Sequence, residues 1–173
     1  MGHSSNAIYK GRYLYPIIED VDLAQISQKR LQQARSCKII VAGMSKFIEA
    51  IYDEGNTLAG KSTTIIIGES NKLKFLLAIL NSNLASFFTR IAYNSLKMAG
   101  GFINIGSREM ENIPLPLTTF ARQQPIIDLV DTILLKKQQN PQADTLAEEK
   151  EIDRLVYALY NLTPEEIALI EKG

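Results

Sequence analysis

The stretch "GNTLAGKSTTIIIG", Gly55 to Gly68, decides the fold class, because it allows two incompatible interpretations. Its first half fits the phosphate-binding pattern G-x-x-x-x-G-K-S, in which the residues after the lysine open a helix that holds a nucleotide. Here the lysine and serine lead into Thr-Thr-Ile-Ile-Ile, a β-branched run that favours a strand. Asp53 and Glu54 stand just before the pattern and would repel phosphate. We therefore predict a strand over 62–68, a hairpin-like loop over 54–61, and no nucleotide hydrolase.

The rest of the chain alternates short apolar runs with helical patterns, which predicts an α+β fold. We expect a small mixed β-sheet with packed helices (residues 8–117) and a helical C-terminal part (residues 118–173). Residues 1–7 look like an expression-tag remnant. Further strands are predicted at 37–43, within 47–55 and at 102–105, and helices at 19–35, 71–93, 122–139, 146–160 and after a Thr163–Glu166 capping box.

Composition excludes several classes of protein. The 173 residues hold one cysteine, Cys37, and their one histidine, His3, lies in the tag-like segment. Zinc sites built from thiols and imidazoles, and catalysis by a Ser–His or Cys–His pair, are therefore not expected, and we predict no metal and no catalytic residue. No apolar run approaches the roughly 20 residues of a membrane span, and a lone cysteine suits a reducing compartment. We expect a cytoplasmic chain without a membrane partner.

Two further patterns leave alternatives. The residues Pro141, Asp144 and Glu148–Lys150 resemble the scattered Pro-Asp…Glu-x-Lys signature of restriction nucleases, but they fall on a linker and a helix start, which favours a solvated helix N-terminus. The polar run Asn81–Asn83 interrupts a leucine-rich helix. Either these side chains face solvent and bond the backbone at a bend, or Asn81 pins a neighbouring loop.

The charge is distributed unevenly. Residues 1–108 hold 13 Lys and Arg against 7 Asp and Glu, a net +6, and residues 109–173 hold 6 against 12, a net −6. Such asymmetry indicates either that the first part meets an anion or that the surface is dipolar but inert. Cations, amides and hydroxyls on glycine-containing loops suit contacts with phosphates and base edges. The candidate DNA-binding residues are Lys46, Asn56, Lys61, Ser62, Asn94, Lys97, Asn104 and Arg108.

Five segments, read in order, carry a resemblance to a known family. They are "KIIVAGMSKFIEAIYDEG", "LLAILNSNLASFF", "GGFINIGSREMENIPLPL", "QQPIIDLVDTIL" and "EIDRLVYALYNLTPEEIALIE". Together they resemble the TaqI-like specificity domain that follows an adenine-specific DNA methyltransferase domain in bacterial restriction–modification enzymes. The resemblance covers roughly residues 8–172. It implies a small specificity domain that contacts double-stranded DNA.

The resemblance also implies a division of labour. The Asn-Pro-Pro-Tyr motif of adenine methylation and a glycine-rich turn for S-adenosylmethionine are both absent from these 173 residues. We therefore expect no cofactor here, S-adenosylmethionine in the methyltransferase part of the same polypeptide, and base flipping by that part. Lys46, Lys61, Lys97 and Arg108 would hold phosphates, while residues around Asn56 and 94–104 would read groove edges. The alternative is a protein-interaction module that docks a partner subunit through its acidic C-terminal helices.

Overall fold

The computed structural model describes residues 3–4, 15–16 and 25–172. The predicted tag remnant and the first part of the helix predicted at 19–35 therefore lie largely outside the described residues. Two short strands come first, β1 (His3–Ser4) and β2 (Tyr15–Pro16), and they pair with each other. Helix α1 (Gln28–Arg35) begins after Ser27, whose hydroxyl caps it by accepting from the Arg30 amide.

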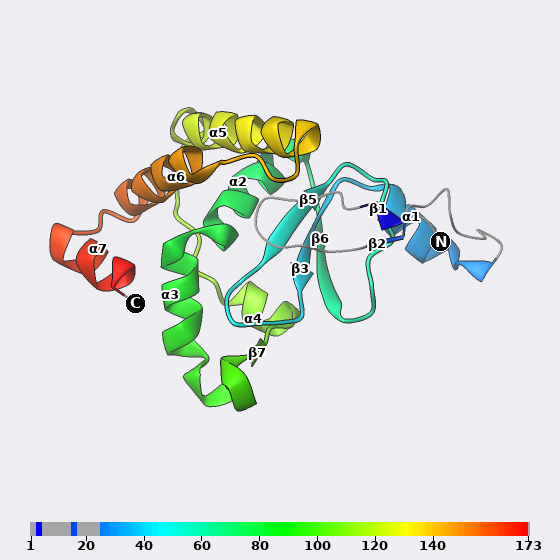
Figure 1. Ribbon diagram of the computed structural model, residues 1–173, viewed down its shortest axis with the longest axis horizontal. Coiled ribbons are helices and arrows are strands. Elements are labelled where there is room, and N and C mark those ends of the chain that lie inside the picture. The colour runs from blue at the N-terminus through cyan, green and yellow to red at the C-terminus, as the bar shows by residue number, and fades with distance from the viewer. Residues whose placement is uncertain (1–2, 5–14, 17–24, 173) are drawn as a thin grey trace.

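A three-stranded sheet forms the centre of the protein (Figure 1). The strand order is β5 (Ala50–Asp53), β3 (Lys38–Ala42) and β6 (Thr63–Ile67), and both pairings are antiparallel. All five residues of β3 are buried, because the strand has a neighbour on each edge and is covered on both faces. The predicted α+β class and the strands at 37–43, 47–55 and 62–68 are confirmed, but the described strand pairs are antiparallel and not mixed.

The predicted hairpin over residues 54–61 is wrong. Strands β5 and β6 both pair with β3 and run parallel to each other, so no tight turn can join them. Instead residues 54–62, the crossover loop, run back along the sheet from the Lys38 end of β3 to its Ala42 end. Ala59 of this loop packs on Ile40 and Ile51, which point to the sheet face opposite the main core. The β-branched run predicts the strand correctly but carries no information about its partner.

The helix predicted at 71–93 is divided in two. Helix α2 (Ser70–Asn81) and helix α3 (Asn83–Ala92) are bent by 62° at Ser82. The Ser82 hydroxyl accepts from the Ala85 amide and donates to the Ile79 carbonyl, so it caps the second helix while ending the first. The apolar period continues across this break, which is why the pattern suggests one helix.

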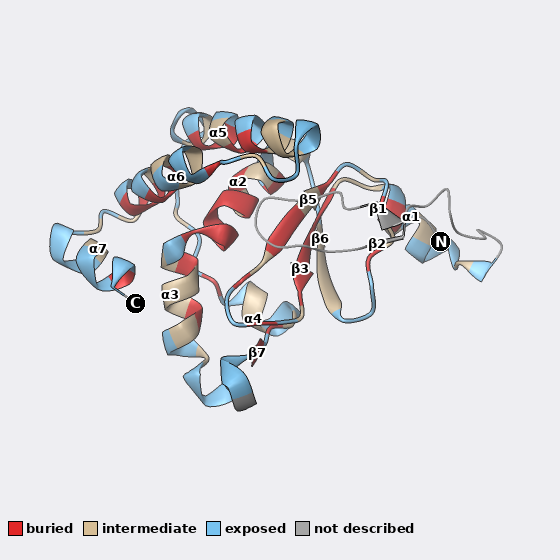
Figure 2. Cartoon of the chain, viewed as in Figure 1, coloured by how far each residue is buried: buried red, intermediate tan, exposed pale blue. Residues whose placement is uncertain are grey.

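The C-terminal helices cover the core on the side of α2. Helix α5 (Phe120–Gln139) lies on α2, and α6 (Leu146–Leu159) packs on α5 and α3 (Figures 1 and 2). Helix α7 (Pro164–Glu171) starts at the predicted Thr163–Glu166 capping box and contacts α3. One hydrophobic core runs from Ile39 of β3 to Leu159 of α6, so both predicted parts of the chain share it.

A second, smaller pair of strands lies beyond the end of β3. Strand β4 (Met44–Ser45) pairs with β7 (Ile103–Asn104). Two 3₁₀ turns, η3 (Asn94–Leu96) and η4 (Ala99–Gly101), connect α3 to β7. Helix α4 (Ser107–Glu111) follows β7. Within the described residues no single helix could span a membrane; α2 and α3 would pass a test of length and composition only as a bent pair.

Candidate nucleic-acid interface

Gly43 joins the central sheet to the β4–β7 pair, which we call the ribbon. Its amide donates to the Ser62 carbonyl (2.9 Å), and its carbonyl accepts from the Ile105 amide (2.8 Å). A Cβ at this position would lie 2.4 Å from the Ser62 carbonyl oxygen, so glycine permits the close approach. Three segments that are distant in sequence therefore meet at one end of the molecule. They are the segment that ends in Lys46, the segment that begins at Lys61, and the segment that contains Asn104.

The connection before β7 folds back tightly onto the ribbon. Met98 and Phe102 are joined by a backbone hydrogen bond of 2.8 Å, and the turn between them needs positive φ at Gly100 (83°) and Gly101 (81°). Lys97 forms a bridge with Ile103. This geometry places Lys97 beside β7 and leaves its side chain exposed.

The cations at this end are available for an anion. The Lys46 ammonium lies over the Phe102 ring, 5.6 Å from its centroid, which fixes its position without neutralising it. All four proposed phosphate-binding residues are exposed, and within the described part of the chain none of them forms an ion pair with a carboxylate. They are Lys46, Lys61, Lys97 and Arg108.

The predicted polar residues divide between this end and elsewhere. Asn104 is exposed and pairs with Met44 across the ribbon, and Ser62 is exposed beside Gly43. Asn94 lies in η3, where its carbonyl accepts from the Lys97 amide (3.3 Å). These three residues and the cations Lys46, Lys61 and Lys97 therefore lie on the ribbon or on segments bonded to it.

Arg108 follows on α4, next to the ribbon. Tyr93 at the end of α3 ties this helix in place by donating from its hydroxyl to the Glu109 carbonyl (3.0 Å). Burial, and then the nearby Glu109 carboxylate, raise the pKa of Tyr93, so its hydroxyl keeps its proton at neutral pH. The helix that presents Arg108 is thus held against the α3 terminus.

Asn56 is not part of this group. It follows β5 at the opposite end of the sheet, where Asp53 pairs with Lys38 in the strand register. The separation is the length of β3, five residues or about 16 Å. Asn56 is exposed, and its amide donates to the Asp53 carboxylate (3.4 Å).

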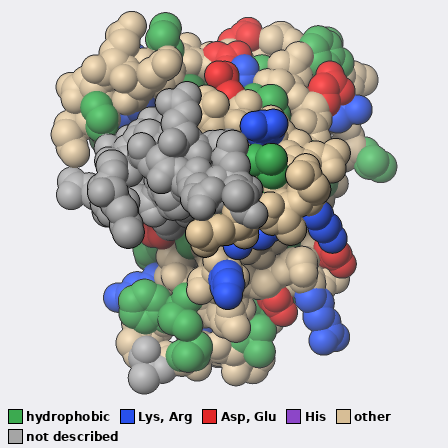
Figure 3. Space-filling view, turned by 90° about the vertical axis from the view of Figure 1, so that its right-hand side faces the viewer, with side chains coloured by type: hydrophobic (Ala, Val, Ile, Leu, Met, Phe, Trp, Pro, Cys, Tyr) green, Lys and Arg blue, Asp and Glu red, His purple; other side chains and the backbone are tan. Residues whose placement is uncertain are grey.

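Large apolar side chains accompany the cations at the ribbon, and sequence reasoning missed them. Hydrophobic groups gather beside Lys and Arg at the lower end of Figure 3, which is the same end as the η3–η4 segment in Figure 1. The exposed apolar residues of this region are Met44, Phe47, Leu96, Met98 and Phe102. The signal was present in "LKM", 96–98, where a cation stands between two apolar residues in a polar loop.

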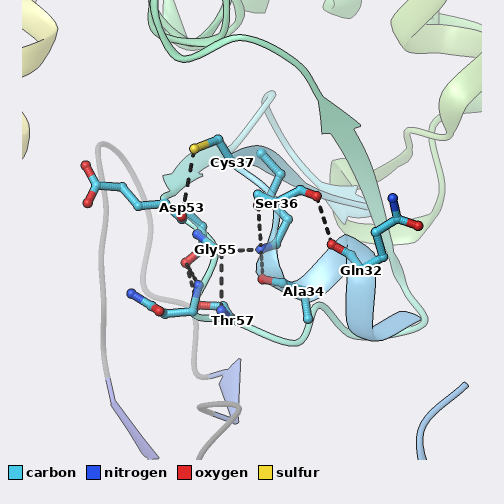
Figure 4. Close-up of polar contacts among 10 residues, drawn as sticks. Gln32, Ala34, Ser36, Cys37, Asp53, Gly55 and Thr57 are labelled. Atoms are coloured by element: carbon cyan, nitrogen blue, oxygen red, sulfur yellow. Dashed lines mark hydrogen bonds and ion pairs between the residues drawn. The ribbon is translucent and has the colours of Figure 1, made fainter. Parts of the chain in front are cut away.

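A buried polar junction lies at the other end of β3 (Figure 4). The Lys38 ammonium, 0% exposed, pairs with the Asp53 carboxylate and donates to the carbonyls of Ala34 (2.7 Å) and Ser36 (3.2 Å). Asp53 also accepts from the Thr57 hydroxyl (2.8 Å). Because Ala34 and Ser36 end α1 and Thr57 belongs to the crossover loop, the junction fastens both segments to the sheet.

The junction also determines which group binds the backbone amides of the phosphate-loop pattern. The amides of Gly55, Asn56 and Thr57 all donate to the Asp53 carboxylate, so the chain's own anion occupies the donors at the start of the pattern. Gly55 has a φ of 113°, which glycine tolerates. After Lys61 and Ser62 comes strand β6 and not a helix, as the β-branched run predicts.

The nuclease-like residues are engaged in helix structure. The Asp144 carboxylate accepts from the Leu146 amide (2.9 Å), and Glu148 on the first turn of α6 pairs with Lys136 of α5. The hydrogen bond from Lys136 lowers the pKa of Glu148. Asp144 therefore bonds the start of α6, and Glu148 joins α6 to α5. Both carboxylates lie at a helix start as the sequence predicts, but Glu148 is 16% exposed and is thus largely covered instead of solvated.

Comparison with protein families gives the decisive observation. A family model described as the TaqI-like C-terminal specificity domain matches residues 5–115, more than half of the chain. The chain belongs to this family. The match spans the sheet, the crossover loop, the ribbon and α2–α4, and it confirms the resemblance drawn from the sequence. A search of curated proteins finds no match. Membership of this specificity-domain family indicates DNA target recognition in restriction–modification enzymes.

Proposed function

We propose that this TaqI-like specificity domain recognises double-stranded DNA through the ribbon end of the molecule, and that it is not catalytic by itself. The observation that carries the proposal is that the hydrogen bonds of Gly43 join the segments bearing Lys46, Lys61 and, through the Ile103 bridge, Lys97. Among the described residues none of these three cations has a carboxylate partner. Exposed cations of this kind are what binding to the phosphate backbone requires. Arg108 is exposed on α4, the helix that follows β7.

Within this surface the cations and amides have different tasks. Lys46, Lys61, Lys97 and Arg108 contact phosphates, which fixes the orientation of the domain on the duplex. Asn94 and Asn104, with Ser62, offer amide and hydroxyl groups to base edges. The exposed side chains of Met98 and Phe102 suit apolar contacts with sugars or with the thymine methyl group.

The catalytic steps belong to another part of the same polypeptide under this proposal. That part is an adenine-specific methyltransferase that binds S-adenosylmethionine and flips the target base, and the system includes restriction activity. The cytoplasmic location stays a prediction. A second candidate, docking of a partner protein through the acidic helices, is favoured less, because Glu148 and Glu151 of α6 are already paired with Lys136 and Arg154.

A salt titration tests the proposal. The 173-residue protein is titrated into a fluorescein-labelled 20-bp duplex, and its dissociation constant is measured from low to moderate salt. Each phosphate contact contributes a slope of about −0.9 in log affinity against log salt. Lys97→Ala and Arg108→Ala should each weaken binding and flatten that slope by roughly one unit for each phosphate that the variant no longer neutralises.

Lys150→Ala is the matched control, because Lys150 is exposed on α6, away from the ribbon. It should leave the slope unchanged. If Lys150→Ala changes the salt slope while Lys97→Ala and Arg108→Ala do not, the DNA binds a different side of the molecule from the one proposed. Absence of any duplex binding at low salt would refute the proposal.

A further inference from the structure

Helix α1 carries positive charge and no acidic residue. Its eight residues, "QKRLQQAR", hold Lys29, Arg30 and Arg35, and none of these forms an ion pair within the described residues. Six of its eight residues are polar or charged, and Ala34 is its one buried residue. A surface helix normally buries a broad apolar stripe, and α1 has scarcely any. Packing alone therefore does not account for its composition.

Four of the exposed residues of α1 share one side of the helix, and Arg30, which is also exposed, lies on another. Gln28, Gln32 and Arg35 follow each other at spacings of four and three, which places them in line, and Lys29 lies beside them. All four are exposed, while Ala34 is buried and Leu31 is half-buried. We call Gln28, Lys29, Gln32 and Arg35 the α1 stripe. It combines the glutamine amides that bind adenine edges with cations that bind phosphates or guanine.

The helix that bears this stripe is held firmly from behind. Lys38 donates to the carbonyls of Ala34 and Ser36, which satisfies the C-terminal end of α1 with a buried cation. The guanidinium of Arg30 donates to the Ala59 carbonyl of the crossover loop (3.1 Å). Gly55 approaches the Arg35 carbonyl so closely that a Cβ would lie 2.4 Å from its oxygen. These contacts orient α1 relative to the sheet, as recognition of a rigid partner requires.

The crossover loop links the α1 stripe to the ribbon. In Figure 1 the loop descends from α1 to the lower end of β6, next to the β4–β7 pair. Lys61 lies two residues after Ala59, the point where Arg30 holds the loop, and Ser62 then bonds to Gly43. The crossover loop, which carries Lys61, therefore joins the end of the sheet that bears α1 to the end that bears the ribbon.

We propose that α1 is a second DNA-contacting element, which reads the duplex in its major groove. This inference rests on the proposed function. Lys29 and Arg35 contact phosphates, and Gln28 and Gln32 contact base edges. Charge complementarity selects the partner, because the α1 stripe offers Lys29 and Arg35 without an acidic residue, and a DNA duplex carries one negative charge per about 1.7 Å. An α-helix with its side chains is about 10–12 Å in diameter, which fits a major groove about 12 Å wide.

The first test extends the salt titration to α1, with the same labelled 20-bp duplex. Lys29→Ala and Arg35→Ala should each flatten the salt slope by roughly one unit and weaken binding severalfold at low salt. Lys150→Ala is the control for removal of a surface cation. Lys97→Ala reports on the ribbon. Circular dichroism and thermal melting show that each variant remains folded.

The outcomes separate the inference from the proposed function. If Lys97→Ala flattens the slope while Lys29→Ala and Arg35→Ala behave like Lys150→Ala, α1 does not touch DNA and the ribbon proposal survives. If the unmodified protein does not bind the duplex at low salt, both fail. If the α1 variants flatten the slope and Lys97→Ala does not, α1 is the DNA element and the ribbon proposal fails.

The second test addresses base reading. Duplexes with a randomised central segment are selected for binding to the protein, and the enriched sequences are compared between variants. Gln28→Ala and Gln32→Ala should relax the preference at particular positions, with a salt slope close to that of the unmodified protein. Gln138→Ala, an exposed glutamine of α5, is the control. Enrichment identical to that of Gln138→Ala, or no enrichment by the unmodified protein, would overturn base reading by α1.

Discussion

Lys38 shows how a single residue can organise two segments. A charged side chain with no exposed area is costly to bury unless every donor finds an acceptor. Lys38 meets that condition with the Asp53 carboxylate and the carbonyls of Ala34 and Ser36. The sequence places Lys38 at the start of a buried strand but does not reveal its partners, because Asp53 lies 15 residues away.

The first prediction concerns this ion pair. Lys38→Met should lower the free energy of unfolding by about 3–5 kcal/mol, because it leaves the Asp53 carboxylate buried without its cation. The measurement is urea denaturation followed by circular dichroism. Lys72→Met is the matched control, since Lys72 is 80% exposed beside Glu69 and should change stability by less than about 1 kcal/mol.

A double-mutant cycle completes the test of that prediction. Lys38→Met combined with Asp53→Leu should cost less than the sum of the two single changes, because neither charge is then left alone. The double variant stays less stable than the unmodified protein, since the amides of Gly55–Thr57 lose their acceptor. Additive single effects would show that the two charges act independently.

Asn81 decides between the two alternatives that the sequence allowed for the polar run 81–83. Its side chain accepts from the Ala50 amide (3.0 Å) and donates to the Ala50 carbonyl (2.9 Å). It therefore pins the first residue of β5, while Ser82 makes the bend and Asn83 is exposed. Both interpretations hold, each for a different residue. Sequence alone could not assign them, because neighbouring polar residues have the same local propensity.

At the scale of elements, local pattern and long-range pairing differ in how far they can be predicted. Residues 62–68, the helices from 122 onward and the Thr163–Glu166 capping box follow from propensity and spacing, and the structure confirms them. The crossover loop does not, because the position of β3 between β5 and β6 is a tertiary choice. A loop with a glycine near its start, such as Gly55, suits a hairpin and a crossover equally well.

Gly43 gives a prediction at the junction of the sheet and the ribbon. Gly43→Ala should destabilise the protein by about 1–3 kcal/mol, since its Cβ would lie 2.4 Å from the Ser62 carbonyl and the backbone would have to move. Hydrogen exchange should increase at the Ile105 amide, which donates to Gly43. Gly60→Ala, with no atom within 4 Å of its Cβ, should be neutral. Equal stability of the two variants would show that this close approach is unimportant.

The segment between α4 and α5 depends on Tyr160. Its hydroxyl donates to the Pro114 carbonyl (2.7 Å), and burial raises the pKa of Tyr160 to about 12. In the unfolded chain the phenol loses its proton near pH 10. The folded state thus holds more protons between pH 10 and 12, so this contribution is complete below pH 10 and is lost as the pH rises to 12.

Tyr160→Phe tests this dependence. The variant should be less stable by about 1 kcal/mol at pH 7, through removal of one hydrogen bond, and its stability should fall less steeply between pH 10 and 12. Urea unfolding at several pH values between 9 and 12 gives the comparison. If the free energy of unfolding of the variant falls as steeply with pH as that of the unmodified protein, other tyrosines cause the loss of stability at alkaline pH.

The whole molecule shows which part of the candidate site the sequence can predict. The charge difference between residues 1–108 and 109–173 points to the portion of the chain that holds the proposed site, and Lys46, Lys61 and Lys97 lie on segments that are bonded to one another at the ribbon. The grouping depends on Gly43, whose contacts join residues about 20 and 60 positions away in the chain. Asn56 resembled the other loop residues in type but lies at the opposite end of β3. The chemical type of a residue can be read from the sequence, whereas its position beside other site residues depends on the fold.

The last prediction is that this protein, purified alone, neither transfers a methyl group to DNA nor cleaves it. Methyl transfer to adenine needs a polar motif such as Asn-Pro-Pro-Tyr beside the flipped base, and these residues contain none. Metal-dependent cleavage needs converging carboxylates, whereas Asp144 accepts from the Leu146 amide and Glu148 pairs with Lys136. The assay incubates the protein with labelled S-adenosylmethionine, magnesium and a mixed plasmid substrate, beside a heat-treated sample. Methyl incorporation or cutting above that background, abolished by Glu148→Gln but not by Lys150→Ala, would reveal a catalytic centre on α6 and end the interpretation of this chain as a pure reader of DNA.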